Sequence, residues 1–186
     1  ATRYQGSKYK IMNWIWDVIS PFEFETALDA FGGTGVVGHR LKCEGKEVTY
    51  NDILESNYHM GLALIENSEK RLSDNEVKLI LNEKSMKYDN IIQRNFDNIY
   101  YTPDENKWLD IIIQNIETIE DRYKRAIAYF ALFQSCIIKR PYNLFHRKNL
   151  YVRFAEVERN FGNKTTWDQP FPFYFKKFVD EANRAV

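Results

Sequence analysis

The chain has 186 residues, of which 44% are hydrophobic and 28% charged, values typical of a globular protein and not of a disordered or fibrous one. Lysine plus arginine number 26, as do aspartate plus glutamate, so the zero net charge excludes a globally basic nucleic-acid binder and confines any such contact to a local patch. The two cysteines and three scattered histidines predict neither a disulfide framework nor a metal site, and no apolar run is long enough to span a membrane. We therefore expect a cytoplasmic protein without metal or membrane association.

The first fifty residues carry the pattern of a β–loop–α–β unit. A helix is predicted over residues 7–19, where apolar side chains recur at spacings of three and four. A short strand over 26–31 runs into Gly32-Gly33-Thr34-Gly35, a helix over 36–43 follows, and a second strand covers 47–50. This order begins a parallel sheet and predicts the α/β fold class. Because two strands do not make a stable open sheet by themselves, the sheet is expected to be incomplete on this chain.

Residues 53–140 carry helix signals and few strand signals. Ser73-Asp74-Asn75-Glu76 and Thr102-Pro103-Asp104-Glu105 are capping boxes, which mark helix starts. The helical period after the second box is too long for one typical helix, so we expect a break near Glu120 and an end at Pro141. The remaining predictions are a helix over 53–72, a loop over 161–174 and a helix over 175–186.

The glycine-rich loop after the first strand predicts a nucleotide cofactor. Gly33-Thr34-Gly35-Val36-Val37-Gly38 fits the pattern G-x-G-x-x-G, in which glycine permits a sharp turn and a close approach of the ligand. The following helix directs its N-terminus at that ligand. Asp52 follows the second strand, about 20 residues after Gly33, where an acid accepts hydrogen bonds from ribose hydroxyls. Loop and acid together predict an adenosine-containing cofactor, either a dinucleotide or S-adenosylmethionine.

The carboxylate of Asp29 favours the second of these cofactors. A dinucleotide places an anionic pyrophosphate over the loop, where a nearby carboxylate is unfavourable, whereas S-adenosylmethionine places an ammonium and a sulfonium there. Alternatively, Asp29 caps the turn or the helix that follows. An NAD(P)-dependent oxidoreductase therefore stays open as an alternative to a methyltransferase.

Five separated segments carry a resemblance to a known family. They are Arg3-Tyr4-Gln5-Gly6-Ser7-Lys8, Asp29-Ala30-Phe31-Gly32-Gly33-Thr34-Gly35, Asn51-Asp52, 137–147 and 161–167. In this order they resemble the Dam-like family of DNA adenine-N6 methyltransferases. The resemblance implies a Rossmann-like S-adenosylmethionine-dependent core, incomplete on this chain, with a helical target-recognition insertion. It divides the chain into a cofactor-binding part at 1–55, a mainly helical target-recognition region at 56–160 and a return toward the core at 161–186.

The resemblance, together with the charge argument for Asp29, also assigns the cofactor site. The assigned residues are Tyr4, Lys8, Asp29, Phe31, Gly33, Gly35 and Asp52. Tyr4 and Lys8 are expected against the methionine end of the cofactor, where the Lys8 ammonium pairs with the carboxylate. Without the resemblance, the preferred interpretation is a solvated surface lysine for Lys8 and a packing aromatic for Tyr4.

The family's catalytic tetrapeptide, Asp/Asn-Pro-Pro-Tyr/Phe, is absent, because no two of the five prolines are adjacent. In the family it holds a flipped adenine by hydrogen bonds and stacking. The nearest sequence is Asp168-Gln169-Pro170-Phe171, which lacks the first proline and makes Asp168 the catalytic candidate on this chain. The resemblance therefore predicts the N-terminal part of a methyltransferase, completed by a C-terminal half or second subunit with the tetrapeptide. A non-catalytic module that binds S-adenosylmethionine or DNA is the alternative.

Residues 139–153 are rich in basic and aromatic side chains and contain no acidic one. On a neutral protein such a stretch favours a surface that contacts DNA phosphates, with aromatics that can stack on an unpaired base. The predicted DNA-binding residues are Lys139, Arg140, Asn143, Arg147, Lys148 and Arg153. The alternative places the aromatics in the core and the basic side chains on a solvated rim. The resemblance favours double-stranded DNA as the partner.

Overall fold

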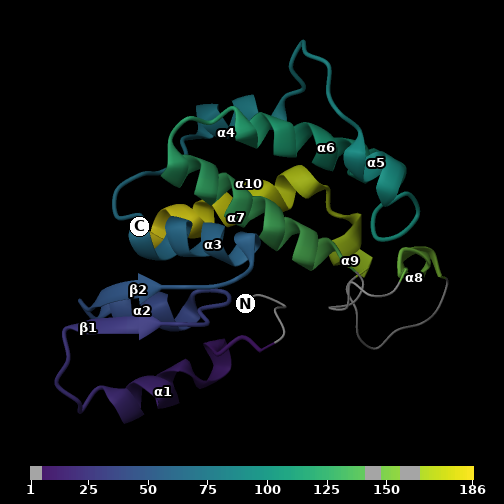
Figure 1. The fold of residues 1–186 in the computed structure, drawn as a ribbon. Helices are drawn as coiled ribbons and strands as arrows, with labels where there is room; N and C mark the ends of the chain where they lie inside the picture. The colour runs from purple at the N-terminus through teal and green to yellow at the C-terminus, as the bar shows by residue number, and fades with distance from the viewer. Residues whose placement is uncertain (1–5, 141–147, 156–163) are drawn as a thin grey trace.

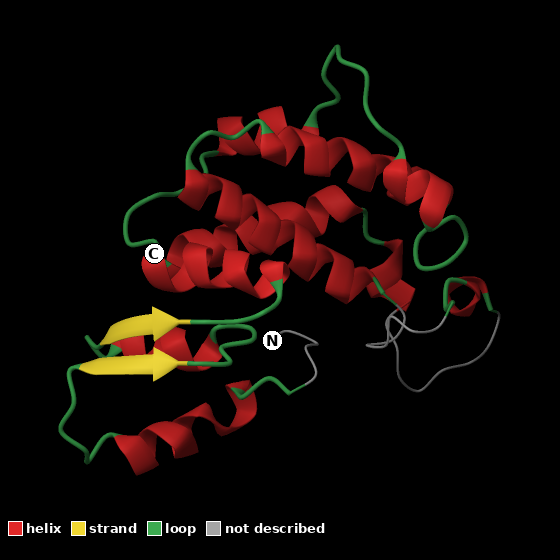
Figure 2. Ribbon diagram, viewed as in Figure 1, coloured by secondary structure: helices red, strands yellow, loops and turns green. Residues whose placement is uncertain are grey.

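The chain forms a small sheet with flanking helices and, above it, a larger helical layer (Figure 1). The computed structural model describes residues 6–140, 148–155 and 164–186. The sheet layer comprises η1 (Tyr9–Ile11, a 3₁₀ turn), α1 (Met12–Ile19), β1 (Thr26–Asp29), α2 (Val36–Cys43) and β2 (Glu47–Tyr50). The remaining elements are α3 (Glu55–Gly61), η2 (Leu62–Glu66, a π-helical turn), α4 (Asp74–Leu81), α5 (Ile91–Asn95), α6 (Pro103–Glu117), α7 (Arg122–Lys139), α8 (Tyr151–Phe154), α9 (Lys164–Asp168) and α10 (Phe171–Ala185). Helix dominates the described residues (Figure 2).

The β–loop–α–β unit is confirmed. Strands β1 and β2 pair in parallel, with Thr26 opposite Glu47 and Asp29 opposite Tyr50, and they form a two-stranded sheet among the described residues. Helix α2 connects them and packs against both, as a parallel crossover requires. Both strands therefore deliver their C-terminal residues to the same edge of the sheet, beside the glycine loop. The predicted first strand was two residues too long.

Side-chain hydrogen bonds explain where α4, α6 and α7 begin. Ser73 Oγ accepts a hydrogen bond from Glu76 N, and the Glu76 carboxylate accepts one from Ser73 N at 2.9 Å. Thr102 and Glu105 form the same reciprocal pair at α6. Both predicted capping boxes are confirmed. The predicted break near Glu120 is confirmed too, because α7 starts afresh after Asp121, whose carboxylate caps it.

Helix α7 is the centre of the helical layer. Its side chains are buried around its whole circumference, with Ala126, Ile127 and Ala131 fully inaccessible. Such all-round burial marks a helix enclosed by others. Helix α10 packs along it through Phe175 and Val179, which are at most 1% exposed, and α3 and η2 cover another side. The main core therefore lies above the sheet.

Two predicted helix boundaries were wrong. The helix predicted over 53–72 ends at Glu66, since the buried Asn67 side chain accepts hydrogen bonds from Glu69 N and Lys70 N and donates one to Lys70 O. The regular helix predicted from Ser7 starts only at Met12, after the 3₁₀ turn. Both corrections shorten elements of the right type.

The loop predicted over 161–174 was also wrong in its described part, residues 164–174. Helix α9 occupies 164–168, and α10 starts at Phe171, four residues before the predicted helix. Pro170 is the N-cap of α10 and Pro172 lies in its first turn, where the backbone needs no N–H donor. The aromatic side chains of Phe171 and Tyr174 are buried and not in a solvated loop. Proline here marked a helix start.

The predicted methyltransferase core, with its insertion and domain boundaries, is larger than the elements described above. Within the described ranges no helix is both long and apolar enough to cross a membrane. The predicted domain boundary at residue 160 lies outside the described residues, and helix α10, predicted to lead back toward the core, packs on α7. The Rossmann-like core and the insertion stay predictions.

Candidate cofactor loop and DNA-facing region

The glycine loop is held at the carboxyl edge of the sheet by hydrogen bonds that its amides donate to residues after β2. Gly33 and Gly35 have φ angles of 54° and 71°, in the left-handed region that glycine adopts without strain. Gly33 N donates to Asp52 Oδ2 at 2.8 Å, and Gly32 N donates to the Asn51 carbonyl at 3.0 Å. The loop after β1 is thereby fastened to the residues that follow β2.

Asp52, the predicted ribose acceptor, accepts hydrogen bonds through both carboxylate oxygens. Its second oxygen, Oδ1, accepts from Leu54 N at 2.9 Å. Partial burial by itself would raise the pKa of this carboxyl, but hydrogen bonds from Leu54 N, Gly33 N and the Asn57 side chain outweigh burial and lower it. Asp52 is therefore an anion at neutral pH. Each carboxylate oxygen has two lone pairs, so further hydrogen bonds from hydroxyls are possible.

Asp29 plays the capping role that the sequence left open. Its Oδ2 accepts from Gly38 N, in the first turn of α2, at 3.0 Å. Burial raises the pKa of Asp29, and the negative charge of the nearby Asp52 raises it further. The hydrogen bond from Gly38 N and the positive charge of Lys8 act in the opposite direction. Two carboxylates and one lysine thus influence one another across the loop. Such a site favours a cationic group on a ligand, and a contact of Asp29 with the cofactor stays a prediction.

The other predicted cofactor residues lie around this edge. The exposed Lys8 donates from Nζ to the Gly6 carbonyl at 3.0 Å, close enough to Asp29 to affect its pKa. Phe31 is 92% exposed at the loop. Tyr4 lies outside the described residues. The structure therefore brings Lys8, Asp29, the glycines and Asp52 together.

A cleft of about 880 Å³ opens beside the loop. It lies between the 3₁₀ turn, α2 and the end of α10, and Thr34, Gly35, His39 and Arg184 are among its lining residues. Of the predicted cofactor residues that the structure describes, Gly35 is the one that lines it. The cleft therefore adjoins the predicted cofactor edge and does not contain Gly33 or Asp52.

The predicted DNA-binding role of Lys139 was wrong, because its side chain is interior. The residue is 2% exposed, and its ammonium lies 2.7 Å from Glu105 Oε1 and donates to the Trp167 and Gln169 carbonyls at 2.8 and 2.7 Å. Three donors thus meet three acceptors, and none is left for a phosphate. Burial lowers the pKa of Lys139, which the Glu105 carboxylate counteracts.

Arg153 and Arg140 are also withdrawn from the surface. Arg153 pairs through both terminal nitrogens with Glu105 and donates to the Trp167 carbonyl, and its side chain is 9% exposed. Arg140 is 3% exposed. These positions disagree with phosphate contact, because a phosphate-binding side chain must reach the surface. We call Glu105, Lys139 and Arg153 the Glu105 cluster.

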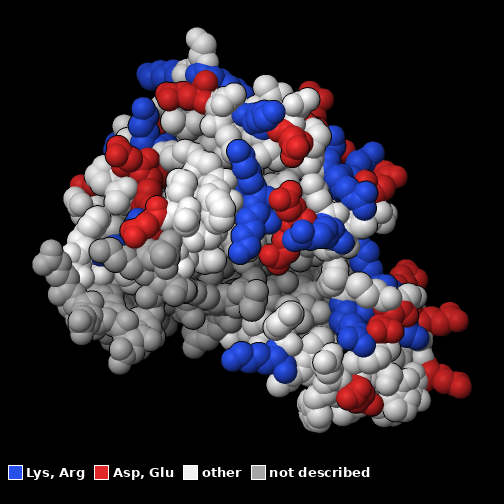
Figure 3. Space-filling model, turned by 180° about the vertical axis from the view of Figure 1, so that it is seen from behind, with Lys and Arg blue, Asp and Glu red and all other residues white. Residues whose placement is uncertain are grey.

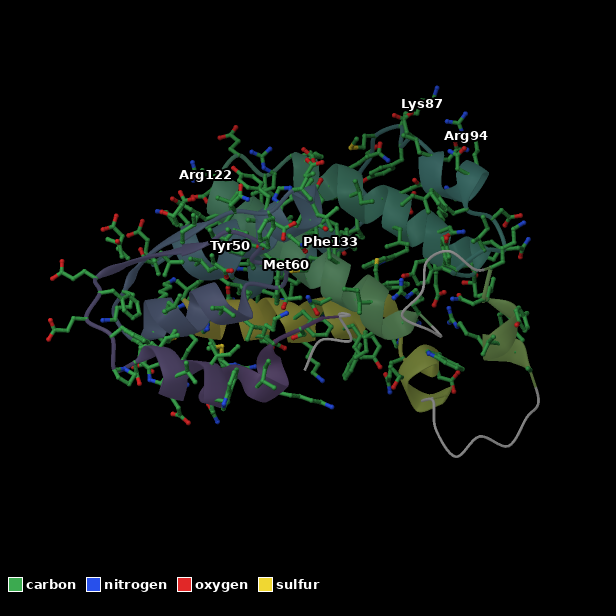
Figure 4. All side chains as sticks on the ribbon, turned by 60° about the horizontal axis from the view of Figure 1, so that its bottom comes forward. Tyr50, Met60, Lys87, Arg94, Arg122 and Phe133 are labelled. Atoms are coloured by element: carbon green, nitrogen blue, oxygen red, sulfur yellow. The ribbon has the colours of Figure 1, made fainter. Side chains whose placement is uncertain are left out.

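The remaining predicted DNA-binding residues differ in whether the structure describes them. Lys148 is exposed, and Asn143 and Arg147 lie outside the described residues. Asp168, the catalytic candidate, is exposed at the end of α9. On the face shown in Figure 3, basic and acidic side chains are interspersed. Figure 4 shows Lys87 and Arg94 pointing outward at the periphery of the helical layer, and the sequence analysis gave neither residue a role.

Tyr50 is a loop-contacting residue that sequence reasoning missed. Its hydroxyl lies 2.6 Å from the Gly33 carbonyl oxygen and 3.0 Å from the Asn57 carbonyl oxygen. The available signal was an aromatic residue at a strand end, between a glycine loop and the cofactor acid.

Comparison with known proteins places the chain in a family. The model of the D12 class N6 adenine-specific DNA methyltransferases matches residues 4–169, which include the glycine loop and Asp52. The chain belongs to this family. It is 30% identical over 188 residues to the Type II methyltransferase M2.HphI of Haemophilus parahaemolyticus, an alignment that covers 98% of this chain and 55% of the relative. The chain thus spans about half the length of that methyltransferase. No solved structure matches it significantly.

Proposed function

We propose that this chain is the cofactor-binding part of an adenine-specific DNA methyltransferase that transfers a methyl group from S-adenosylmethionine to adenine N6. Membership of the D12 family supports the reaction class. The observation that carries the cofactor assignment is the Asp52 carboxylate, which holds the Gly33 amide of a glycine loop at the carboxyl edge of a parallel pair. Such an edge is where α/β proteins bind nucleotides.

The charges at this edge favour S-adenosylmethionine over a dinucleotide. Burial raises the pKa of Asp29, and the negative charge of the nearby Asp52 raises it further. A pyrophosphate would add two negative charges near them, whereas a sulfonium and an ammonium would relieve their repulsion. Lys8, on the same side, is available to pair with the methionine carboxylate once it exchanges its hydrogen bond to the Gly6 carbonyl.

Double-stranded DNA is the proposed substrate, and the chemistry needs groups that this chain lacks. The adenine amine would attack the sulfonium methyl in line, so the protein contributes positioning and electrostatic stabilisation. We propose that an Asp-Pro-Pro-Tyr segment, from a C-terminal half or a second subunit, holds the flipped adenine. Exposed basic side chains such as Lys148 are the proposed phosphate contacts, and no metal is required. A cytoplasmic location stays a prediction.

Calorimetric titration of the chain with S-adenosylmethionine tests the cofactor assignment. We expect saturable binding that weakens at least about tenfold in Asp52→Asn, because charged hydrogen bonds contribute roughly 1.5–3 kcal/mol. Asp17→Asn, which removes an exposed carboxylate of α1, is the matched control and leaves affinity unchanged. Saturable binding of NAD or NADP in place of S-adenosylmethionine would overturn the assignment.

The alternative function is a non-catalytic module that binds the cofactor or DNA. A methyl-transfer assay on adenine-containing duplex separates the two. Turnover that appears only when a tetrapeptide-bearing half is added supports the proposed methyltransferase part. Cofactor binding with no turnover in the reconstituted pair supports the module.

A further inference from the structure

The ring of Tyr50 fills space that two glycines, Gly32 and Gly61, leave open. A Cβ built at Gly32 would lie 2.0 Å from Tyr50 Cε2, and one at Gly61 would lie 2.4 Å from Tyr50 Cδ1. A Cβ at Gly35 would also lie within 3.9 Å of the ring. Gly32 and Gly61 have no φ in the left-handed region, so backbone freedom does not explain why glycine stands there. The close approach of a rigid ring does.

The Tyr50 hydroxyl completes the attachment of the loop. It contacts the Gly33 carbonyl oxygen at 2.6 Å and the Asn57 carbonyl oxygen at 3.0 Å, so its single proton is shared between the loop and α3. The N–H of Gly33 donates to Asp52. Gly33 is therefore held at its amide by Asp52 and at its carbonyl by Tyr50.

The position of Tyr50 in the fold explains why one side chain can do this. It is the last residue of β2, opposite Asp29, and it comes two residues before Asp52. Figure 4 shows it toward the middle of the molecule, in projection next to Met60. A movement of the ring would therefore shift the loop and α3 together.

We propose that Tyr50 is the positioning residue of the cofactor loop: it sets the conformation of Gly32 to Gly35 and so determines affinity for S-adenosylmethionine without touching it. The inference rests on the proposed function for its consequence, but the loop geometry can be tested independently. It also predicts that Gly61, on a different element, matters to the cofactor only through the Tyr50 ring.

Tyr50→Phe is the first test, because it keeps the ring and removes the hydroxyl. We expect affinity for S-adenosylmethionine to fall about 3- to 10-fold, the range that corresponds to loss of one intramolecular hydrogen bond. Hydrogen exchange, measured by NMR, should accelerate by a similar factor at the Gly33 amide and stay unchanged at Gly45, whose amide lies in a remote turn. A general loss of stability would accelerate both amides. Tyr58→Phe, on exposed α3 surface, is the control that changes neither measurement.

Gly61→Ala is the second test. The backbone of Gly61 is already helical, with φ −60° and ψ −47°, so alanine adds only the contact with the ring. We expect Gly61→Ala to accelerate Gly33 exchange in the parent and to have no such effect in Tyr50→Val, where the ring is gone; this coupling identifies the path.

The outcomes separate the two claims. Unchanged Gly33 exchange in both Tyr50→Phe and Gly61→Ala would overturn the positioning role, whatever the cofactor. If the parent binds S-adenosylmethionine and Tyr50→Phe binds it equally well, the consequence for affinity is refuted while the proposed function stands. A parent that binds none refutes the proposed function, and exchange still decides the role of Tyr50.

Discussion

Neutralising the acid of the Glu105 cluster should destabilise the protein strongly. The Glu105 side chain is 15% exposed, and it pairs with Lys139 and Arg153, which are 3% and 9% exposed. Its pKa is lowered, because the hydrogen bonds from Arg153, Lys139 and Thr102 N outweigh the effect of burial. In Glu105→Gln the two cations stay buried without a counter-charge, and an amide N–H₂ group replaces one acceptor.

The expected loss is about 3–5 kcal/mol, the cost of removing one partner from a buried pair. For a chain of this size this corresponds to a fall of roughly 6–20 °C in Tm. Glutamine at this position still supports the capping box, since Gln serves as well as Glu three residues after the cap. The substitution therefore isolates the charge from the helix cap.

Urea unfolding followed by circular dichroism measures the loss, with Glu44→Gln as the matched control. Glu44 pairs with Arg40 at 2.7 Å on the surface of α2, with side chains 31% and 34% exposed, so this pair should contribute only about 0.3–0.5 kcal/mol. If Glu105→Gln costs no more than Glu44→Gln, the buried cluster does not hold α6, α7 and α8 together, and Lys139 and Arg153 become available again as DNA contacts.

Further predictions concern pH, the core and the surface. The pKa of Asp29 is raised by burial, and a cationic ligand binds better to the ionised form of this carboxyl. The affinity for S-adenosylmethionine should therefore increase as the pH rises through the pKa of Asp29 and level off above it. Calorimetry should show that this pH dependence of the affinity vanishes in Asp29→Asn. Partial burial would raise the pKa of Glu76, but hydrogen bonds from Lys124 and Ser73 outweigh it and lower this pKa to about 2. The stability that Glu76 contributes to the fold is therefore complete above pH 4.5, the ordinary pKa of the group, and disappears as the pH falls toward 2. Urea unfolding of Glu76→Gln at a series of pH values should lack this loss of stability. Phe175→Ala, at a fully buried contact between α10 and α7, should cost about 3–5 kcal/mol in the same assay, and a loss below about 1 kcal/mol would contradict the packing. Lys148→Ala should weaken binding to duplex DNA and reduce its salt dependence by about one unit in a fluorescence titration, whereas a salt slope equal to the parent's would exclude a phosphate contact.

Local signals were sufficient for much of the sheet layer and for the starts of α4, α6 and α7. The capping boxes at Ser73 and Thr102 involve residues three positions apart, so chain geometry alone places the partners. The pairing of β1 with β2 follows from a short strand, a glycine break, a helix and a second strand, because a crossover of that length permits only parallel neighbours. The grouping of the glycine loop with Asp52 was predictable for the same reason.

Tertiary structure decided what the basic stretch does. Lys139 and Arg153 look like phosphate contacts in a sequence without nearby acids, but their counter-charge, Glu105, comes from more than thirty residues earlier, at the start of another helix. Likewise, Pro170 and Pro172 resemble loop residues until the aromatic side chains of α10 are seen packed on α7. The ring of Tyr50 lies against Gly61, which no local pattern connects to the glycine loop. Hydrogen bonds between near neighbours are encoded by spacing, whereas burial and charge pairing depend on which distant segments the folded core brings together.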